Sequence, residues 1–316
     1  MFYRKRTQTL FSPSWLGFNS ISKKINDLNP DIVHLHWICG GMLRIEDLST
    51  IKAPIVWSLH DMWPFTDGLH YCEDTSSYIK ERGKSRVLGS NNSGTLSRKV
   101  FKRKQNTYKK LNNLHIVGLS SWINNCSMSS TLLKEKKHIN LPNPINVNIF
   151  KPLDKSVSKY IHNLPIDKKL VLFGAMDATT DPRKGFNELL ESLEKLNENN
   201  VELVIFGSSK PKEKSQISTR YKINYIGKLS DDISLNVLYN AVDVMVVPSL
   251  QENLSNAIME SLSCGVPVVA FDIGGNKDMV THKENGYLAN PFDIEDLKNG
   301  ISYIINHKNY HIISNN

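Results

Sequence analysis

The chain is poor in several features that mark common protein classes. Its four cysteines in 316 residues are scattered without metal-site spacing, so we expect free thiols in a reducing compartment. No apolar run is long enough to cross a membrane, and the basic start lacks the apolar segment of a secretory signal. No Gly-x-Gly-x-x-Gly follows a strand-like run, which argues against a nicotinamide-dependent dehydrogenase. These absences leave an ordinary globular protein.

Acidic residues are nearly absent from one stretch of this chain of net charge +8. Between Lys80 and Lys110 there are eleven Lys or Arg residues and one acid, Glu81. Apolar residues near helical spacing predict a basic amphipathic helix over residues 95–111. Such a helix can lie on an anionic membrane surface, and a solvated helix face is an equally good interpretation. The stretch has no interleaved aromatic platform of the kind that would indicate nucleic acid as a partner.

Strand-like and helix-like segments alternate along the whole chain. Near-continuous apolar strands separated by helices predict a parallel sheet that is covered on both faces. The runs that predict strands are 31–37, 54–59, 115–119, 170–174, 201–207, 243–247 and 266–271. Residues 64–94 are interpreted as a loop.

A stretch without periodicity divides this series into two halves. Residues 141–152 contain three prolines and predict the approach to an interdomain linker. We therefore expect an α/β chain with two Rossmann-like parallel-sheet domains, residues 1–152 and 153–316, that face a cleft. In such sheets ligands bind beyond the carboxyl ends of the strands.

The most informative segment contains two glutamates, Glu252 and Glu260. They straddle the expected start of a short helix, capped by Ser255 or Asn253 and ended near Gly265. A helix N-terminus favours a diphosphate, and carboxylates accept hydrogen bonds from sugar hydroxyls. The segment thus predicts a nucleotide-sugar site, although two solvated glutamates on a surface helix would explain the pair if it stood alone.

Two further segments strengthen this interpretation. Arg183 and Lys184 precede an expected helix, where two cations oppose the helix dipole unless an anion is bound, and they could neutralise a departing diphosphate. Gly274 and Gly275 follow a strand and offer bare backbone amides to a ligand. The alternatives are solvated surface charges for Arg183 and Lys184, and an ordinary turn for Gly274 and Gly275.

The first half of the chain offers one candidate residue. His60 follows a strand and could donate a hydrogen bond to a sugar hydroxyl, or be a packed histidine satisfied by a carbonyl. His34 and His36 share one strand face and are interpreted as structural. No Ser-His-Asp or Cys-His ordering stands out, and no carboxylate cluster indicates a metal.

These segments together resemble the family 4 (group 1) retaining glycosyltransferases of the GT-B fold, over about residues 12–305. The first half is similar to a bacterial subgroup associated with surface polysaccharides, through 30–37 and 57–66. The motifs of the second half are Tyr225-Ile226-Gly227, Ala241-Val242-Asp243-Val244, Pro248-Ser249, Glu252 to Glu260, Cys264-Gly265-Val266-Pro267-Val268-Val269-Ala270, Gly274-Gly275 and Asn285-Gly286-Tyr287-Leu288.

The resemblance implies a nucleoside-diphosphate sugar as donor substrate, with no cofactor and no metal. It implies that Glu260 holds the ribose, Glu252 the donor sugar and Lys184 the diphosphate with help from Arg183, while His60 touches the sugar from the first domain. The leaving phosphate would deprotonate the acceptor, so no protein base is expected. The remaining donor-binding residues implied are Asn253, Leu254, Ser255, Asn256, Gly274 and Gly275.

The chain also departs from the family pattern. Ala175 stands where many members carry arginine, and nothing before Phe11 matches the family's first strand and glycine-rich loop, which implies a chain truncated at its N-terminus. We expect hexosyl transfer to a lipid-linked or saccharide acceptor in surface polysaccharide biosynthesis, in the cytoplasm or at the inner face of the plasma membrane. The alternatives are a non-catalytic remnant that binds nucleotide and a nucleotide-sugar epimerase of the same fold.

Overall fold

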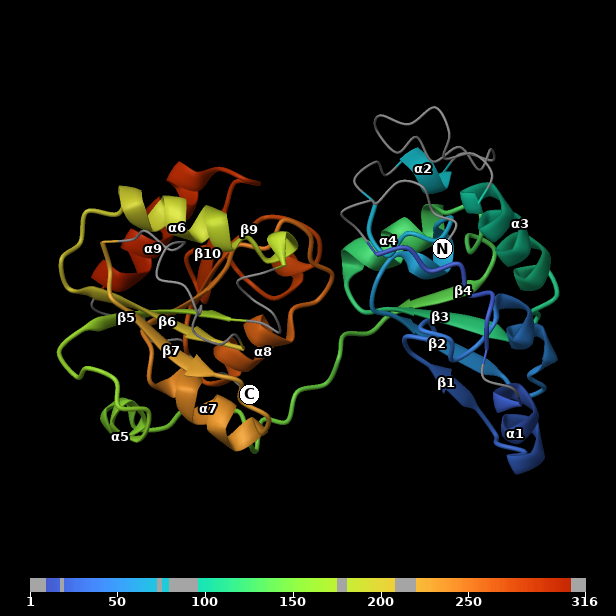
Figure 1. Cartoon of the computed structure of the whole chain (residues 1–316), viewed down its shortest axis with the longest axis horizontal. Coiled ribbons are helices and arrows are strands. Elements are labelled where there is room, and N and C mark those ends of the chain that lie inside the picture. The colour runs from blue at the N-terminus through green and yellow to red at the C-terminus, as the bar shows by residue number, and fades with distance from the viewer. Residues whose placement is uncertain are drawn as a thin grey trace. The chain divides into compact units, whose positions relative to one another are not determined.

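A computed structural model describes residues 10–17, 20–72, 76–79, 96–174, 181–207 and 220–307. The chain forms two compact units, Met1–Asn143 and Pro144–Asn316, and each is described by itself (Figure 1). The division falls inside the predicted linker, where residues 141–154 contain no helix or strand.

The first unit contains a parallel four-stranded sheet in the order β1-β2-β3-β4. Its strands are β1 (Val33–Leu35), β2 (Ile55–Leu59), β3 (Leu114–Gly118) and β4 (Lys137–Asn140). Its helices are α1 (Ile21–Leu28), α2 (Ser76–Ile79), α3 (Leu96–Tyr108) and α4 (Ser121–Ser129), with the 3-10 turns η1 (Ile45–Thr50) and η2 (Trp63–Phe65). The predicted loop 64–94 therefore overlaps η2 and includes α2, while residues 73–75 and 80–94 lie outside the described residues.

The second unit contains a parallel six-stranded sheet in the order β10-β9-β8-β5-β6-β7. Its strands are β5 (Lys169–Gly174), β6 (Val201–Phe206), β7 (Ile223–Gly227), β8 (Val244–Val247), β9 (Val268–Phe271) and β10 (Gly286–Ala289). Its helices are α5 (Lys155–Ile161), α6 (Phe186–Lys195), α7 (Asp232–Asn240), α8 (Asn256–Ser263) and α9 (Ile294–Asn306), with the 3-10 turns η3 (Pro182–Lys184) and η4 (Asn276–Asp278).

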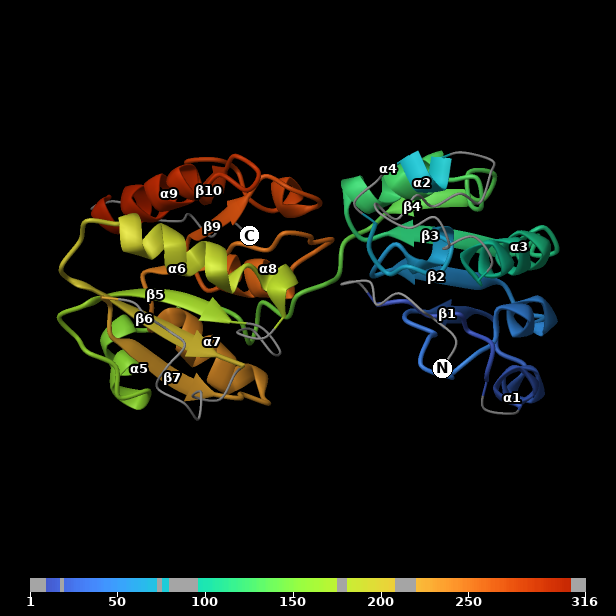
Figure 2. The ribbon, with the colours of Figure 1, turned by 45° about the horizontal axis from the view of Figure 1, so that its top comes forward.

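Successive residues of the central strands enter two different cores in the second unit. Val171 and Phe173 of β5 pack in one cluster with residues of α6 and α9. Leu170 and Leu172 pack in the other with residues of α7 and α8. Figure 2 shows α6 and α9 on one side of the sheet and α7 on the other. The prediction of a parallel sheet covered on both faces is confirmed here, and the apolar runs are continuous because both faces of each central strand are buried.

The predicted basic helix is α3, and its apolar side is part of the core of the first unit. Val100, Phe101 and Tyr108 are buried. Lys104, one of its cations, is also fully buried: its ammonium donates to the carbonyls of Trp63 and Thr66 and lies over the Trp63 ring. The apolar side of α3 is therefore not available to enter a bilayer in the folded unit.

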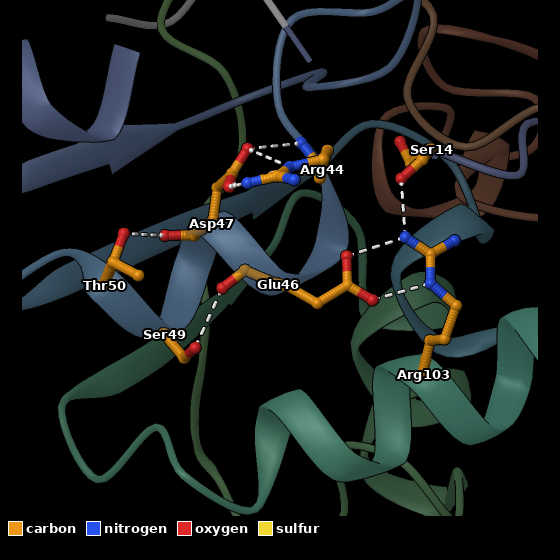
Figure 3. A network of polar contacts seen from close by, with 7 residues as sticks. All are labelled: Ser14, Arg44, Glu46, Asp47, Ser49, Thr50 and Arg103. Atoms are coloured by element: carbon orange, nitrogen blue, oxygen red, sulfur yellow. Dashed lines mark hydrogen bonds and ion pairs between the residues drawn. The ribbon is translucent and has the colours of Figure 1, made fainter. Parts of the chain in front are cut away.

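A second cation of α3, Arg103, ties this helix to η1 and to the segment before α1 (Figure 3). Its guanidinium donates to both carboxylate oxygens of Glu46 at 2.6 and 2.7 Å, and to the carbonyls of Pro13 and Ser14 at 2.8 and 3.0 Å. In the same network Arg44, the residue before η1, pairs with Asp47 of η1. Arg103 is thus a structural cation, and the sequence pattern did not separate it from the exposed ones.

Candidate functional site

The predicted donor-site segments follow three neighbouring strands. In the sheet β5 lies next to β8, and β8 lies next to β9. Arg183 and Lys184 come after β5, the two-glutamate segment after β8, and the two glycines after β9. Because the carboxyl ends of parallel strands meet at one edge of a sheet, these segments share an edge. Residues 175–180, including Ala175, lie outside the described residues.

The turn η3 is fixed on the loop that follows β8. The Leu250 amide donates to the Arg183 carbonyl at 2.9 Å, and the Arg183 guanidinium donates to the Gln251 carbonyl at 3.3 Å. Gly185 ends η3 with a φ of 74°, and a β-carbon there would lie 1.8 Å from the Pro248 carbonyl oxygen. Only glycine allows the backbone to come this close to Pro248, so Gly185 lets the two loops pack against each other.

The two predicted cations each have a carboxylate partner. Lys184 Nζ lies 3.1 Å from Glu252 Oε2, and Arg183 Nη2 lies 3.2 Å from Asp181 Oδ2. Both belong to η3, because α6 begins only at Phe186. The prediction that both precede a helix is confirmed, and their carboxylate partners offset their charge beside the positive end of α6. Their binding of a diphosphate stays a prediction.

Glu252 is the buried member of the glutamate pair. Only 8% of the residue is exposed, and its Oε2 accepts from Ser249 Oγ at 3.3 Å as well as from Lys184. Neither Ser249 nor Lys184 contacts the second carboxylate oxygen of Glu252, Oε1. The structure thus brings Glu252 and Lys184 into contact, and their binding of a sugar and a phosphate stays a prediction.

Helix α8 begins after Ser255, one of the two predicted caps, and ends at Ser263. The Ser255 carbonyl accepts from the Ile258 and Met259 amides, and Gly265 has a φ of 75° just beyond the helix. Asn253 and Ser255 are buried, Leu254 is half-buried and Asn256 is exposed. The predicted helix is confirmed, and its positive end lies between the two glutamates in sequence.

Glu260 lies in a different setting from Glu252. Its Oε2 accepts a hydrogen bond of 2.8 Å from the hydroxyl of Tyr239, a buried residue of α7. Desolvation raises the pKa of the Glu260 carboxyl above its ordinary value, the Tyr239 hydrogen bond lowers it, and Asp232 raises it. The sequence pattern does not indicate Tyr239 as a partner of Glu260, because Tyr239 is 21 residues away on another helix.

The two glycines form the turn between β9 and η4. Gly274 has a φ of 53°, and the buried Asn276 closes the turn by donating from Nδ2 to the Phe271 carbonyl at 3.0 Å. The 3-10 turn η4 follows. The approach of a ligand to these amides stays a prediction.

His60, in the first unit, is exposed and follows β2 directly. Its Nε2 lies 2.8 Å from Nδ1 of His36, which follows β1. Desolvation of the ring lowers the pKa of His60 below its ordinary value; His36 and His34 lower it further, and Asp61 opposes them. The interpretation of His36 as purely structural is incomplete, because its ring contacts the predicted site residue.

The first unit also contains a Ser-His-Asp chain that the sequence did not reveal. His70 lies 2.8 Å from Ser12 Oγ through Nε2 and 2.6 Å from Asp61 Oδ2 through Nδ1. His70 is only 2% exposed. The Ser12 amide donates to the Gly68 carbonyl, and the His70 amide to the Leu10 carbonyl. This chain therefore fastens the segment around Ser12 to the loop after β2, and its ring is closed to a substrate.

Within the described ranges, no group of three or more His, Cys, Asp or Glu residues is arranged to hold a metal ion. All four cysteines are free thiols. None of the helices in the described part of the chain has the length and apolarity needed to cross a membrane.

Comparison with known proteins finds similarity to glycosyl transferases, most of it in the second unit. The model of the group 1 glycosyl transferases matches residues 167–307. Protein CapJ of Staphylococcus aureus is 33% identical over 183 residues, which are 55% of this chain and 46% of CapJ. The D-inositol 3-phosphate glycosyltransferase of Mycolicibacterium smegmatis is 26% identical over 181 residues, 54% of this chain and 41% of that protein. The chain spans less than half the length of these curated relatives.

Solved structures extend the likeness to the first unit. The sucrose-phosphate synthase of Thermosynechococcus elongatus has a TM-score of 0.68 at 20% identity, covering 92% of this chain and 68% of that one. HepE of Anabaena, solved with UDP and glucose, has a TM-score of 0.62 at 17% identity, covering 92% and 73%. At these identities the likeness shows the fold. The chain has the GT-B fold, and its residues 167–307 match the model of the group 1 glycosyl transferases.

Proposed function

We propose that the chain transfers a hexosyl unit, with retention, from a nucleoside-diphosphate sugar to a lipid-linked or saccharide acceptor in surface polysaccharide biosynthesis. The observation that carries the proposal is the edge formed after β5, β8 and β9, where Lys184 and Glu252 are in contact. It lies inside the region matched by the family model. HepE, a neighbour in fold, binds UDP and glucose, which agrees with this donor class.

Each donor-site residue has a chemical role under this proposal. Lys184 binds the diphosphate, and the first amides of α8 add a positive dipole end. Glu252 then accepts from hydroxyls of the donor sugar, and Glu260 accepts from the ribose. The leaving phosphate takes the proton of the acceptor hydroxyl, so none of these side chains acts as the base. The reaction would take place in the cytoplasm, where it would draw on nucleotide sugars.

Replacing Glu260 with glutamine is expected to weaken donor binding. The amide can still accept from Tyr239, but the charged acceptor for the ribose hydroxyls is lost, which costs about 1–3 kcal/mol, or roughly 5–150-fold in Kd. The raised pKa of Glu260 predicts that wild-type binding falls as pH drops through it, a dependence that the variant lacks. Calorimetric titration with UDP, GDP and ADP, together with hydrolysis of the matching sugars, measures both effects.

Glu191→Gln is the matched control, because Glu191 is an exposed glutamate of α6 paired only loosely with Lys195 at 3.9 Å. Equal donor binding and turnover in Glu260→Gln and in wild type would refute the site. Nucleotide binding without any turnover would favour the non-catalytic remnant, and an isomerised sugar formed without acceptor would favour the epimerase.

We further propose that α3 adsorbs the protein on an anionic membrane through charge alone. The exposed cations of α3 and the two residues after it are Arg98, Lys99, Lys102, Lys109 and Lys110. Attraction of this kind contributes about 1 kcal/mol per cation near the surface and is screened by salt. The double change Lys99→Glu and Lys102→Glu should therefore reduce co-sedimentation with phosphatidylserine vesicles by at least about tenfold at low salt.

Phosphatidylcholine vesicles are the control for this prediction, since they carry no net charge. Wild-type binding that survives 1 M salt would contradict adsorption by charge. So would equal binding of the wild type and the double variant.

A further inference from the structure

The second unit contains a cavity of about 360 Å³ at the edge of its sheet opposite to the predicted donor-site segments. Lys169 is the first residue of β5, Asp243 directly precedes β8, and Pro267 directly precedes β9. The cavity is therefore formed at the amino ends of the same three strands whose carboxyl ends lead to the donor-site segments. Its volume lies in the range of about 300–1,000 Å³ that is usual for small-ligand sites. We call it the amino-edge cavity, and its other walls include Lys155 of α5, Cys264 after α8, and Ile304 and Ile305 of α9.

One carboxylate that lines the amino-edge cavity is held firmly in place. Asp243 Oδ2 accepts from the Leu170 amide at 2.8 Å, and the Asp243 amide donates to the Leu170 carbonyl at 2.9 Å. Only 12% of the Asp243 side chain is exposed. Desolvation acts to raise the pKa of this carboxyl, but Lys155, the Leu170 amide and Lys169 together hold the pKa below its ordinary value. Asp243 is therefore a fixed anion.

Two lysines converge on the other oxygen of this carboxylate. Lys155 Nζ lies 3.1 Å and Lys169 Nζ lies 3.5 Å from Asp243 Oδ1. Both lysines line the cavity, and about half of each side chain is exposed, 47% and 51%. An ammonium has three N–H donors, and neither lysine makes a hydrogen bond to any other described residue. One negative charge thus faces two positive charges whose remaining N–H groups are available beside the cavity.

A third lysine adds positive charge behind this pair. Lys159 of α5 is buried and donates from Nζ to two backbone carbonyls at 3.2 and 2.8 Å. Burial lowers the pKa of Lys159, Asp243 raises it, and Lys155 and Lys169 lower it further, while Asp167 raises it. These five charges therefore act on one another, and the three lysines outnumber the two acids. The surplus positive charge favours an anion in the cavity.

The polar wall of the cavity leaves recognition to the two lysines. Asn240 also lines the cavity, but its side-chain amide is fully engaged. Its Oδ1 accepts from the Leu153 amide at 2.7 Å, and its Nδ2 donates to the carbonyls of Lys151 and Asn236 at 3.0 and 2.8 Å. Asn240 thus fastens the segment before α5 to α7, and it has no N–H left for a ligand.

We propose that the amino-edge cavity binds a small phosphate monoester, with the phosphate held between the ammoniums of Lys155 and Lys169. A phosphate monoester carries about −1.5 to −2 charges at neutral pH, which matches two lysines better than the single charge of a carboxylate. Lysine is a common phosphate ligand because its ammonium acts as a point charge. The body of the ligand contacts the apolar part of the wall, which includes Val266, Pro267 and Ile304. This site is separate from the donor site and does not depend on the proposed transfer reaction.

The test is binding of glycerol 3-phosphate to the full chain, measured by calorimetry and by methyl NMR. In wild type we expect heat of binding and shifts of the methyl signals of Val266, Ile304 and Ile305, which line the cavity. Glycerol, which has no charge, should give neither signal, and acetate should bind more weakly than the phosphate ester. The double change Lys155→Met and Lys169→Met removes both ammoniums and keeps apolar stems, so it should raise Kd at least about tenfold.

Lys222→Met is the matched control, because Lys222 is an exposed lysine of the same unit that pairs with Glu202 at 3.3 Å. Lys184→Met separates the two edges of the sheet, and it should bind glycerol 3-phosphate as tightly as wild type does. The proposal is overturned if the lining methyls do not shift in wild type, or if the double variant binds as tightly. Loss of binding in Lys184→Met or in Lys222→Met would overturn it too, because the anion would then be bound elsewhere. The methyl shifts are read in wild type, so they decide the matter even if the double variant does not fold or the chain transfers no sugar.

Discussion

Alanine at position 185 is expected to destabilise the second unit by about 2–5 kcal/mol. Of this, roughly 1–2 kcal/mol comes from the left-handed backbone, since Gly185 has a φ of 74°. The rest comes from the new methyl group, which would lie 1.8 Å from the Pro248 carbonyl oxygen and force the two loops apart, at about 1–3 kcal/mol. Because those loops carry Lys184 and Glu252, nucleotide binding should be lost as well.

Gly227→Ala is the matched control for Gly185→Ala. Gly227 has a φ of 82°, but no atom lies within 4 Å of where its β-carbon would be. Gly227→Ala should therefore lose the free energy of unfolding that the left-handed backbone costs, without the further loss from a steric clash. All five tryptophans (Trp15, Trp37, Trp57, Trp63 and Trp122) belong to the first unit, so their fluorescence transition should not move while far-UV circular dichroism reports the second unit. Equal losses in the two variants would contradict the close approach of Gly185 to Pro248.

The unfolding free energy of the first unit should rise by about 1.5–2 kcal/mol between pH 7 and 8.5, an increment that Lys104→Met abolishes. Burial lowers the pKa of Lys104 from 10.5 to about 7, with partial compensation from Cys39, Asp67 and Asp61. In this range the unfolded chain still binds the proton that the folded unit has released. Stability must then increase with pH, because the unfolded state binds more protons.

The window ends at pH 8.5 because of Cys39. Burial raises the pKa of that thiol from 9.0 to about 11, so above pH 9 its unfolded form loses the proton first, which opposes the further gain from Lys104. Urea titrations followed by tryptophan fluorescence give the free energy at each pH. Lys102→Met, an exposed position of the same helix, is the control and should keep the wild-type slope. If the free energy of unfolding changes with pH in the same way for Lys104→Met and for wild type, Lys104 keeps its ordinary charge when buried.

The sequence predicted the central strands because they are buried on both faces. Residues 170–174 and 201–207 are continuous apolar runs, and β5 and β6 follow them closely. Three strands were not predicted from periodicity. β4 reads Lys-His-Ile-Asn and is largely exposed, β7 is half-buried throughout, and β10 has four residues. Edge strands lack a continuous apolar run, so their positions depend on partners that local sequence does not identify.

The site was predictable as a set of segments but not as a set of contacts. Positions just after strands mark one edge of a parallel sheet, and this placed Lys184 and Glu252 in the same region. Their ion pair joins residues 68 positions apart, through a loop packing that depends on Gly185. The same limit explains why the Tyr239 partner of Glu260 and the His36 partner of His60 appear only in the folded units.

The strand order of the second sheet has a consequence during synthesis of the chain. β5 is the first strand of this sheet to be made, and it pairs with β6 on one side and with β8 on the other. Until Val244–Val247 have left the ribosome, β5 can pair on one side only, and the opposite edge presents unpaired amides and carbonyls. Such an edge is a template for association with other chains. Folding of the second unit therefore carries its greatest aggregation hazard between the emergence of β6 and that of β8.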